Sequence, residues 1–257
     1  MKCSPLRDVE CSQVKRYFAE QLLRRDDLAP YLRVSSVVSV GNDPELVYDI
    51  YCFIPDDLYT HDFSQIHGRC FVVSDQTHSP PVFSRFKDYN WLRTDLSQRV
   101  AIALWIFKRA IVIQDPDDSF ACIIAERDAF FHQSLEDIAR RKYIEFRTDR
   151  HNLRQAIFHK ETMAVGLLKS NVVKLGLEIL MLANELPYPY RKWLPSEVTS
   201  VPEGPEFLEV CSAFLTESDA DRVIQLSDAL VARIITVLER TSNLDSPFLH
   251  EWWLHLD

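Results

Sequence analysis

The sequence predicts an α+β protein, with a small mixed N-terminal sheet domain followed by a C-terminal antiparallel helical bundle. Segments typical of strands occur only in roughly the first hundred of the 257 residues, where β-branched residues cluster between turns. After them, apolar residues recur at steps of three and four, which is the spacing of one helix face. We therefore expect two domains, residues 1–110 and 111–257.

The N-terminal part begins with an amphipathic helix over residues 9–23, where apolar residues keep helical spacing and basic residues point outward. The turn Gly41-Asn42-Asp43-Pro44 then separates two strand-like segments, because glycine, asparagine and proline favour turn geometry. The extended segments expected here, in chain order, are residues 34–40, 46–54, 69–74 and part of 82–92. This region is the candidate sheet.

Helical patterns dominate after Asp95. In chain order we expect helices at residues 96–107, 120–127, 135–147, 152–159, about 161–184 and 223–237, the fifth being the longest. A short apolar piece at 110–113 leads into the turn Asp115-Pro116-Asp117-Asp118, whose carboxylates we interpret as turn residues and not as metal ligands. The helices expected at about 161–184 and at 223–237 each carry a long stripe of apolar residues. These two stripes must pack together, most simply as an antiparallel bundle.

Glycine is scarce, and this excludes several nucleotide-binding classes. The chain has 5 glycines, about 2% of its residues against an average usage of about 7%. Their spacing forms no G-x-G-x-x-G turn, no G-x-x-x-x-G-K loop and no G-x-S-x-G elbow. A dinucleotide-binding Rossmann domain, a P-loop ATPase and a typical kinase are therefore not expected.

Charge and cysteine content indicate the compartment and the partners. The formal net charge of −9 disfavours nucleic acid as a partner, since that binding depends on neutralising phosphates, and it suits a cationic small molecule. Six cysteines without a C-x-x-C pair predict reduced, mostly buried thiols and a cytoplasmic protein. The longest uncharged apolar run, residues 100–107, is too short to span a bilayer, so no membrane is expected.

Asp49 is the sharpest candidate for chemistry. It is the only charged residue between Glu45 and Asp56, and it shares a strand face with Val47, Tyr51 and Phe53. A carboxylate among apolar neighbours is costly unless it is paired or bound to a metal. Two interpretations remain open: a metal ligand, or a structural aspartate that pairs with an arginine or with a helix N-terminus.

The segment from Asn184 to Leu194 is the second candidate. Pro187 and Pro189 stiffen the chain as it leaves the longest predicted helix, so Tyr190 and Lys192 are held on a rigid segment. Lys192 is suited to a phosphate or carboxylate partner. The alternative is that the aromatic side chains only attach the bundle to the sheet domain while Lys192 reaches solvent.

Three stretches of the helical part carry a resemblance to a known family. They are residues 105–117, residues 151–156 and, above all, residues 184–194, with their run of Asn, Pro-Tyr and Lys-Trp-Leu. They resemble the helical C-terminal domain that accompanies minimal nucleotidyltransferases of the DNA polymerase β-like superfamily. The resemblance covers roughly residues 95–200. No single motif within it is catalytic.

The resemblance implies an N-terminal catalytic domain with a small sheet. Such a domain places Gly-Ser at a helix start, Asp-x-Asp on a strand and a third carboxylate on a neighbouring strand, which together hold two Mg²⁺ ions and a nucleoside triphosphate. Asp49 matches the first Asp of that strand, as catalytic and metal-binding residue. Tyr190 and Lys192 become candidates for contacting the nucleotide, and Asp88 and Asp95 candidates for the third carboxylate.

The sequence departs from this pattern at two positions. Tyr51 stands where the second Asp is expected, and a phenol, with a pKa near 10, cannot replace a metal-bridging carboxylate at neutral pH. Gly41-Asn42 stands where Gly-Ser is expected, only eight residues before Asp49. Either the enzyme works with one metal and a changed ligand set, or the site is degenerate.

Three functions follow from these observations. The first is transfer of a nucleoside monophosphate from a nucleoside triphosphate, with Mg²⁺, to a hydroxyl of a small molecule or a protein. The second is a non-catalytic descendant that works as a ligand-binding or protein-interaction module, whose aromatic tail at Trp252-Trp253 docks on the body or on a second copy in a homodimer. The third is a helical scaffold joined to an unrelated sheet domain.

Overall fold

The computed structural model describes residues 5–40, 47–241, 244 and 246–255, with side-chain surroundings given from residue 11 onward. The chain divides into two compact units, Met1–Ala129 and Phe130–Asp257. The first holds a five-stranded sheet and the described part of the second holds helices and no strand, which confirms the predicted α+β class. The boundary expected after residue 110 falls inside the first unit.

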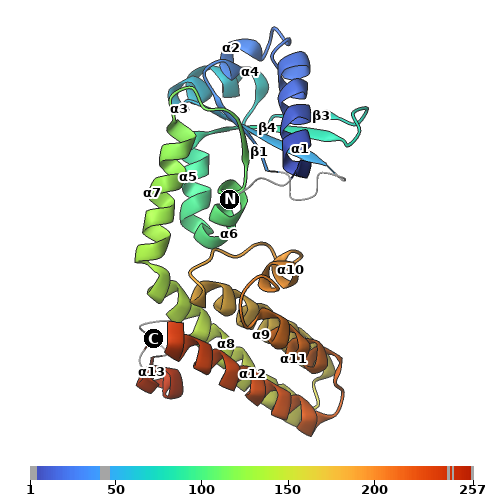
Figure 1. Cartoon of the computed structure of the whole chain (residues 1–257), viewed down its shortest axis with the longest axis vertical. Coiled ribbons are helices and arrows are strands. Elements are labelled where there is room, and N and C mark those ends of the chain that lie inside the picture. The colour runs from blue at the N-terminus through green and yellow to red at the C-terminus, as the bar shows by residue number, and fades with distance from the viewer. Residues whose placement is uncertain (1–4, 41–46, 242–243, 245, 256–257) are drawn as a thin grey trace. The chain divides into compact units, whose positions relative to one another are not determined.

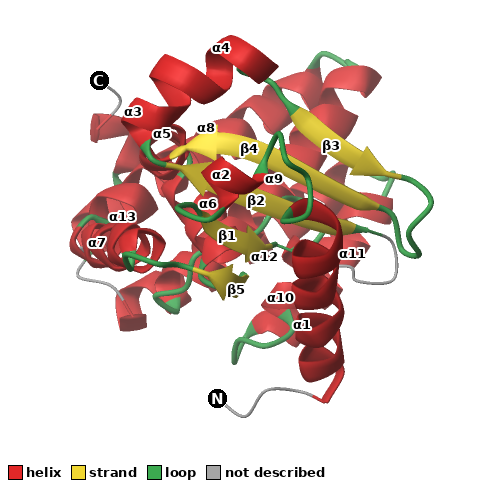
Figure 2. Ribbon diagram, turned by 90° about the horizontal axis from the view of Figure 1, so that it is seen from above, coloured by secondary structure: helices red, strands yellow, loops and turns green. Residues whose placement is uncertain are grey.

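The sheet of the first unit has the strand order β3-β4-β2-β1-β5 (Figure 2). Strands β2 and β4 are parallel, and the other neighbouring pairs are antiparallel. The extended piece expected within residues 82–92 is present as β4, which ends where Asp88 caps a helix that starts at Tyr89. The strand bounds are β1 Ser36–Ser39, β2 Tyr48–Ile54, β3 Val72–Asp75, β4 Val82–Asp88 and β5 Ile111–Gln114.

Helices cover both faces of this sheet (Figure 1). One face presents Ile50, Cys52 and Phe86 to a buried core shared with α1, η1, α2 and η2. On the other face the Phe53 ring lies parallel to the ring of Phe120 at a centroid distance of 5.8 Å. The elements involved are α1 Pro5–Tyr17, η1 Phe18–Leu22, α2 Ala29–Leu32, α3 Asp56–Leu58, η2 Tyr59–Phe63, α4 Ser64–His67, α5 Tyr89–Gln98, α6 Val100–Phe107 and α7 Ser119–Gln133.

The helices between β2 and β3 were not expected from the sequence, because each is only three to five residues long and shows no extended apolar period. The turn expected at Asp115 is present. The Asp115 carboxylate accepts hydrogen bonds from the backbone N–H groups of Phe120 (3.2 Å) and Ala121 (3.0 Å), so it stabilises the start of α7.

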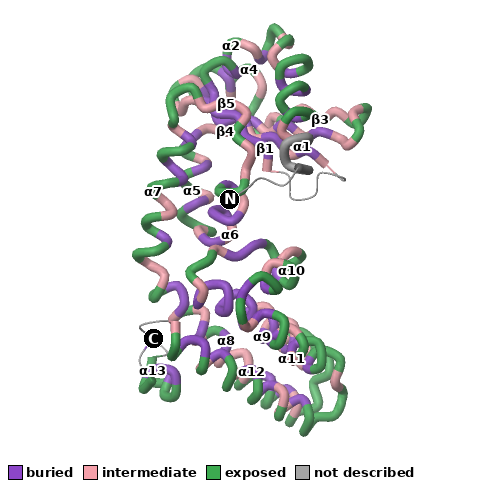
Figure 3. Tube along the Cα trace, in the orientation of Figure 1, coloured by how far each residue is buried: buried purple, intermediate pink, exposed green. Residues whose placement is uncertain are grey.

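The second unit is a helical bundle, in which the two apolar stripes are buried as expected (Figure 3). Residues 135–147 and 152–159 form one continuous helix of 24 residues, so α8 is longer than α9, which has 22. The helices are α8 Leu135–Phe158, α9 Thr162–Ala183, α10 Leu194–Val198, α11 Gly204–Thr216, α12 Ala220–Thr241, α13 Ser246–His250 and η3 Trp252–His255. Short connections make α8 and α9, and α11 and α12, antiparallel neighbours.

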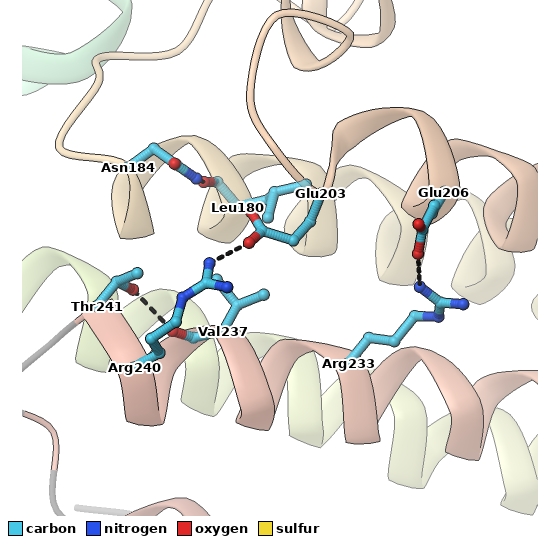
Figure 4. Close-up of polar contacts among 8 residues, drawn as sticks. All are labelled: Leu180, Asn184, Glu203, Glu206, Arg233, Val237, Arg240 and Thr241. Atoms are coloured by element: carbon cyan, nitrogen blue, oxygen red, sulfur yellow. Dashed lines mark hydrogen bonds and ion pairs between the residues drawn. The ribbon is translucent and has the colours of Figure 1, made fainter.

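Close packing and polar contacts join these helices. A Cβ atom at Gly176 of α9 would lie 2.9 Å from the Phe207 ring of α11, so only glycine allows this approach. The buried Lys169 ammonium donates to the carbonyl oxygens of Leu215 (2.9 Å) and Glu217 (2.8 Å). Two ion pairs, Glu203 with Arg240 and Glu206 with Arg233, connect the start of α11 to α12 (Figure 4).

The hydrophobicity of the helices and the state of the cysteines bear on two further expectations. No helix within the described ranges is long and apolar enough to cross a membrane. All five cysteines of the described part are free thiols, but only two are buried; Cys70 and Cys122 are exposed, against the expectation of mostly buried thiols.

Candidate functional site

Asp49 lies near the start of β2, and its carboxylate is paired with an arginine. Its Oδ1 accepts a hydrogen bond from Nε of Arg85 on the adjacent strand β4, at 2.8 Å. Burial raises the pKa of Asp49, and the nearby guanidinium opposes that effect without cancelling it. This contact corresponds to the structural interpretation of Asp49, in which an arginine neutralises the carboxylate.

The neighbouring strand presents cations on this face of the sheet. Because side chains alternate along a strand, Phe83, Arg85 and Lys87 share the face that carries Asp49 and Tyr51. In the parallel register Arg85 is aligned with Tyr51, and Lys87 is aligned with Phe53. The positions at which a third carboxylate is expected on a neighbouring strand therefore carry two basic residues and a phenylalanine.

Tyr51 is part of an aromatic cluster. Its ring lies nearly parallel to that of Trp91, with centroids 5.8 Å apart, and edge-on to Phe107 at 5.7 Å. The Lys87 ammonium lies 5.6 Å from the centre of the Trp91 ring. These contacts give Tyr51 a packing role at the second position of the expected Asp-x-Asp.

The structure does not bring Asp88 or Asp95 to Asp49. Asp88 is aligned with Ile54, five residues beyond Asp49, which is a distance of about 16 Å along the strands. Its Oδ1 accepts the N–H of Trp91 at 2.8 Å and so caps α5. Asp95 forms an ion pair with Arg99 one turn later in α5. Neither aspartate is a third ligand beside Asp49.

The residues present do not fit a two-metal site. In the part of the chain that the structure describes, no group of three or more His, Cys, Asp or Glu side chains is placed to hold a metal ion. The side chain that contacts the Asp49 carboxylate is the Arg85 guanidinium, a cation that repels Mg²⁺, whereas Mg²⁺ prefers carboxylate oxygens. Gly41-Asn42, the counterpart of Gly-Ser, lies outside the described residues.

A pocket of about 390 Å³ lies at the carboxyl ends of the parallel strands β2 and β4. Crevices at this edge of parallel strands are common ligand sites. The pocket is lined by Tyr59, Thr60, Ser64, Arg69, Lys87, Asp88, Asn90, Trp91 and Thr94. It therefore offers two cations and several hydroxyl and amide groups to a ligand. Sequence analysis missed it because Arg69 and Lys87 are far apart in the chain.

Carboxylates already occupy the start of α5 at this pocket. Besides the Asp88 cap, Asp56 accepts the backbone N–H of Asn90 at 2.7 Å and pairs with Arg93 at 3.0 Å. The helix N-terminus is thus satisfied by the protein itself. Within the described residues neither Arg69 nor Lys87 forms an ion pair. These two cations, set against the single Asp88 carboxylate of the lining, leave the pocket with a net positive charge.

Tyr190 and Lys192, the other predicted site residues, belong to the second unit. Both lie on its surface, and the Lys192 ammonium is 4.9 Å from the centre of the Trp193 ring. The anchor of their segment is Tyr188, which is buried, and desolvation together with the Glu178 carboxylate raises its pKa to about 12. Asn184 closes α9 by donating from Nδ2 to the carbonyl oxygen of Leu180 at 2.9 Å (Figure 4).

No family model and no curated protein matches this sequence. The structure is similar to the crystal structure, at 1.90 Å resolution, of a nucleotidyltransferase-like protein from Exiguobacterium sibiricum 255-15. The TM-score is 0.56, and the match covers 93% of this chain and 81% of that chain at 10% sequence identity. The similarity therefore concerns the fold, which includes both the sheet and the helical bundle. Because the match spans both parts, it favours a two-part fold common to the two proteins over a helical bundle joined to an unrelated sheet domain.

Proposed function

We propose that this chain is a nucleotidyltransferase-fold protein that no longer carries out metal-dependent transfer and instead binds a phosphate-bearing ligand. The observation that carries the proposal is the ion pair between Asp49 and Arg85. In a two-metal site the carboxylate oxygens of the first aspartate must be free to bind the metal ions. Here one of those oxygens accepts a hydrogen bond from the protein's own guanidinium.

The basic side chains give the site a different use. Lys87 lines the pocket at the carboxyl ends of β2 and β4, and Arg69 contributes a second cation there. Arginine and lysine bind phosphate directly, without a bridging metal ion. The Thr60 hydroxyl lines the pocket as a further donor, whereas the hydroxyls of Ser64 and Thr94 already donate to backbone carbonyl oxygens. The site therefore suits a phosphate-bearing ligand in its metal-free form.

Isothermal titration calorimetry of the full chain tests this proposal, with inorganic triphosphate and ATP as probes, each in EDTA and in excess Mg²⁺. We expect binding in EDTA that Mg²⁺ does not strengthen, and at least fivefold weaker binding in Lys87→Gln, since a charged hydrogen bond contributes about 1.5–3 kcal/mol. Lys192→Gln removes one lysine charge from the second unit and is the matched control.

The competing function is Mg²⁺-dependent transfer of a nucleoside monophosphate to a hydroxyl. It requires ATP binding that depends on Mg²⁺, that disappears in Asp49→Ala and that leads to release of pyrophosphate. Any of these three results would overturn the proposal, and so would triphosphate binding that Lys87→Gln leaves unchanged.

A further inference from the structure

A second basic pocket lies in the helical unit and shares no residue with the pocket of the sheet unit. It has a volume of about 410 Å³ and is lined by Arg147, Arg150 and His151 of α8 and by Trp252 and Trp253 of η3. Pockets of about 300–1,000 Å³ are the usual size for small-molecule sites. This one combines basic side chains on one wall with two indole rings on the other.

The arginines at this pocket carry more positive charge than the nearby carboxylate neutralises. Arg150 and Arg154 share a single carboxylate, that of Asp228 on α12. Arg147 donates to the carbonyl oxygen of Leu249 at 3.0 Å and to the Tyr143 hydroxyl, and neither acceptor carries a charge. One aspartate thus offsets two guanidinium groups, and the printed contacts of Arg147 add no negative charge, in a protein whose formal net charge is −9.

Two further observations indicate that the charges of these arginines are not fully neutralised within the protein. The Nε atoms of Arg147 and Arg150 are buried and have no hydrogen-bond partner. Desolvation, with the charges of Arg154 and Arg147, lowers the pKa of Arg150 to about 10. Buried donors without partners destabilise a protein. A bound anion would offset that cost by its field, without contact to the Nε atoms themselves.

The two indole rings of the pocket, Trp252 and Trp253, place a second requirement on the ligand. The Trp252 side chain is buried, and its ring centre lies 5.5 Å from the Arg147 guanidinium. Trp253 stands edge-on to Trp252 with centroids 6.5 Å apart, and 53% of it is exposed. An indole exposed at the rim of a basic pocket provides a face on which a flat ring can stack.

We infer that the pocket formed by Arg147, Arg150, His151, Trp252 and Trp253 binds a nucleoside monophosphate, with the phosphate beside the arginines and the base against Trp253. An isolated phosphate would leave the indole face unused, and an uncharged nucleoside would leave the guanidinium charge uncompensated. The ligand therefore carries an anionic group and a flat ring close together in one molecule. No covalent step is proposed.

Quenching of tryptophan fluorescence and isothermal titration of the full chain test this inference, with AMP, adenosine and inorganic phosphate as probes. AMP is expected to bind at least tenfold more tightly than adenosine or phosphate. Trp253→Ala should weaken AMP binding at least fivefold, as expected for loss of one base-stacking contact. Arg150→Gln should weaken it about tenfold through loss of a charged contact.

Matched controls keep the test independent of folding. Leu254→Ala truncates the next exposed side chain, and Arg233→Gln removes an arginine that pairs with Glu206 away from the pocket. Both should leave AMP binding unchanged. The titrations are repeated in the Lys87→Gln background, so that the phosphate-binding pocket of the sheet unit does not contribute to the signal. The inference is overturned if AMP does not bind, if adenosine or phosphate binds as tightly as AMP, or if neither pocket variant weakens binding. Failure of triphosphate binding at Lys87 would instead concern the proposed function alone.

Discussion

At the scale of single residues, Asp49 shows how one contact determines the environment of a carboxylate on a strand. Its carboxylate is mostly removed from solvent and paired with Arg85. Because burial outweighs the guanidinium, the folded protein binds the Asp49 proton more tightly than the unfolded chain does. Folding is therefore linked to proton uptake at this residue.

This linkage predicts a pH dependence of stability. A pKa raised on folding contributes stability that is fully present below the unfolded pKa, near 4, and is lost as the pH rises through the folded pKa. The free energy of unfolding of the wild type, relative to that of Asp49→Asn, should therefore decrease over this range. Urea unfolding of both proteins from about pH 4 to about pH 7 measures it. A relative stability that increases with pH would show that Arg85 dominates the pKa.

Backbone strain at two helix ends is a second residue-scale feature. Lys160 after α8 and Glu185 after α9 adopt positive φ values of 59° and 58°, a region that favours glycine. At both ends the backbone bonds are those of a Schellman motif, for example from the N–H of Leu186 to the carbonyl oxygen of Met181 at 3.0 Å. The scarcity of glycine thus costs stability at these positions.

Glycine at these helix ends should stabilise the protein. We expect Lys160→Gly and Glu185→Gly each to raise the free energy of unfolding by up to about 1 kcal/mol, because they relieve the left-handed strain. The midpoint of urea unfolding measures the gain. Leu167→Gly, at an exposed position within α9, is the control and should destabilise by about 1 kcal/mol. Loss of stability in both cap variants would contradict the assignment of strain.

At the scale of elements, α9 contains two glycines in different surroundings. A Cβ atom at Gly166 would meet no atom within 4 Å, whereas one at Gly176 would press on the Phe207 ring of α11 and lie 3.6 Å from Phe146 of α8. Gly176 therefore sets how closely α9 approaches α11, and Gly166 has no such role.

Alanine substitution separates the two roles. Gly166→Ala should stabilise the bundle by about 1 kcal/mol, since alanine loses less backbone entropy in a helix. Gly176→Ala should destabilise it by about 1–3 kcal/mol through overpacking. Thermal unfolding followed by circular dichroism at 222 nm, where helices give a strong negative signal, compares the two variants. Equal effects of the same sign would show that the close contact between α9 and α11 does not form.

At the scale of the whole molecule, the arrangement of charge predicts which ions stabilise the protein. Both pockets are rich in basic side chains, while the described residues hold no cluster suited to a metal. A ligand that binds only the folded state raises its stability in proportion to the logarithm of its concentration over Kd. Anions and divalent cations should therefore act differently.

Thermal unfolding in the presence of each ion measures this difference. Inorganic triphosphate at about a hundred times its Kd should raise the free energy of unfolding by about 2.7 kcal/mol. MgCl₂ at matched ionic strength should leave Tm unchanged, and EDTA should not lower it. A rise in Tm with Mg²⁺ alone would indicate a cation site and would contradict the charge arrangement described for the sheet face.

Local pattern determined much of this fold. The strands of residues 34–40 and 46–54, the apolar stripes of α9 and α12, and the turn at Asp115 could be predicted because each is encoded by neighbours in sequence. The short helices between β2 and β3 could not, because segments of three to five residues have no apolar period to detect. The continuity of α8 was missed because its polar middle, residues 148–151, interrupts the apolar pattern although the helix continues.

The candidate sites divide in the same way. The sequence by itself determined that Asp49 is an isolated carboxylate on a strand, that Tyr51 stands at the second position, and that too few glycines exist for a Rossmann or P-loop site. Only the tertiary structure decided that Arg85 pairs with Asp49 and that Arg150 and Trp253 line one pocket. Strand register and helix packing place these residues together across 36 to about 100 positions of sequence, and electrostatic and packing energies depend on that distance in space.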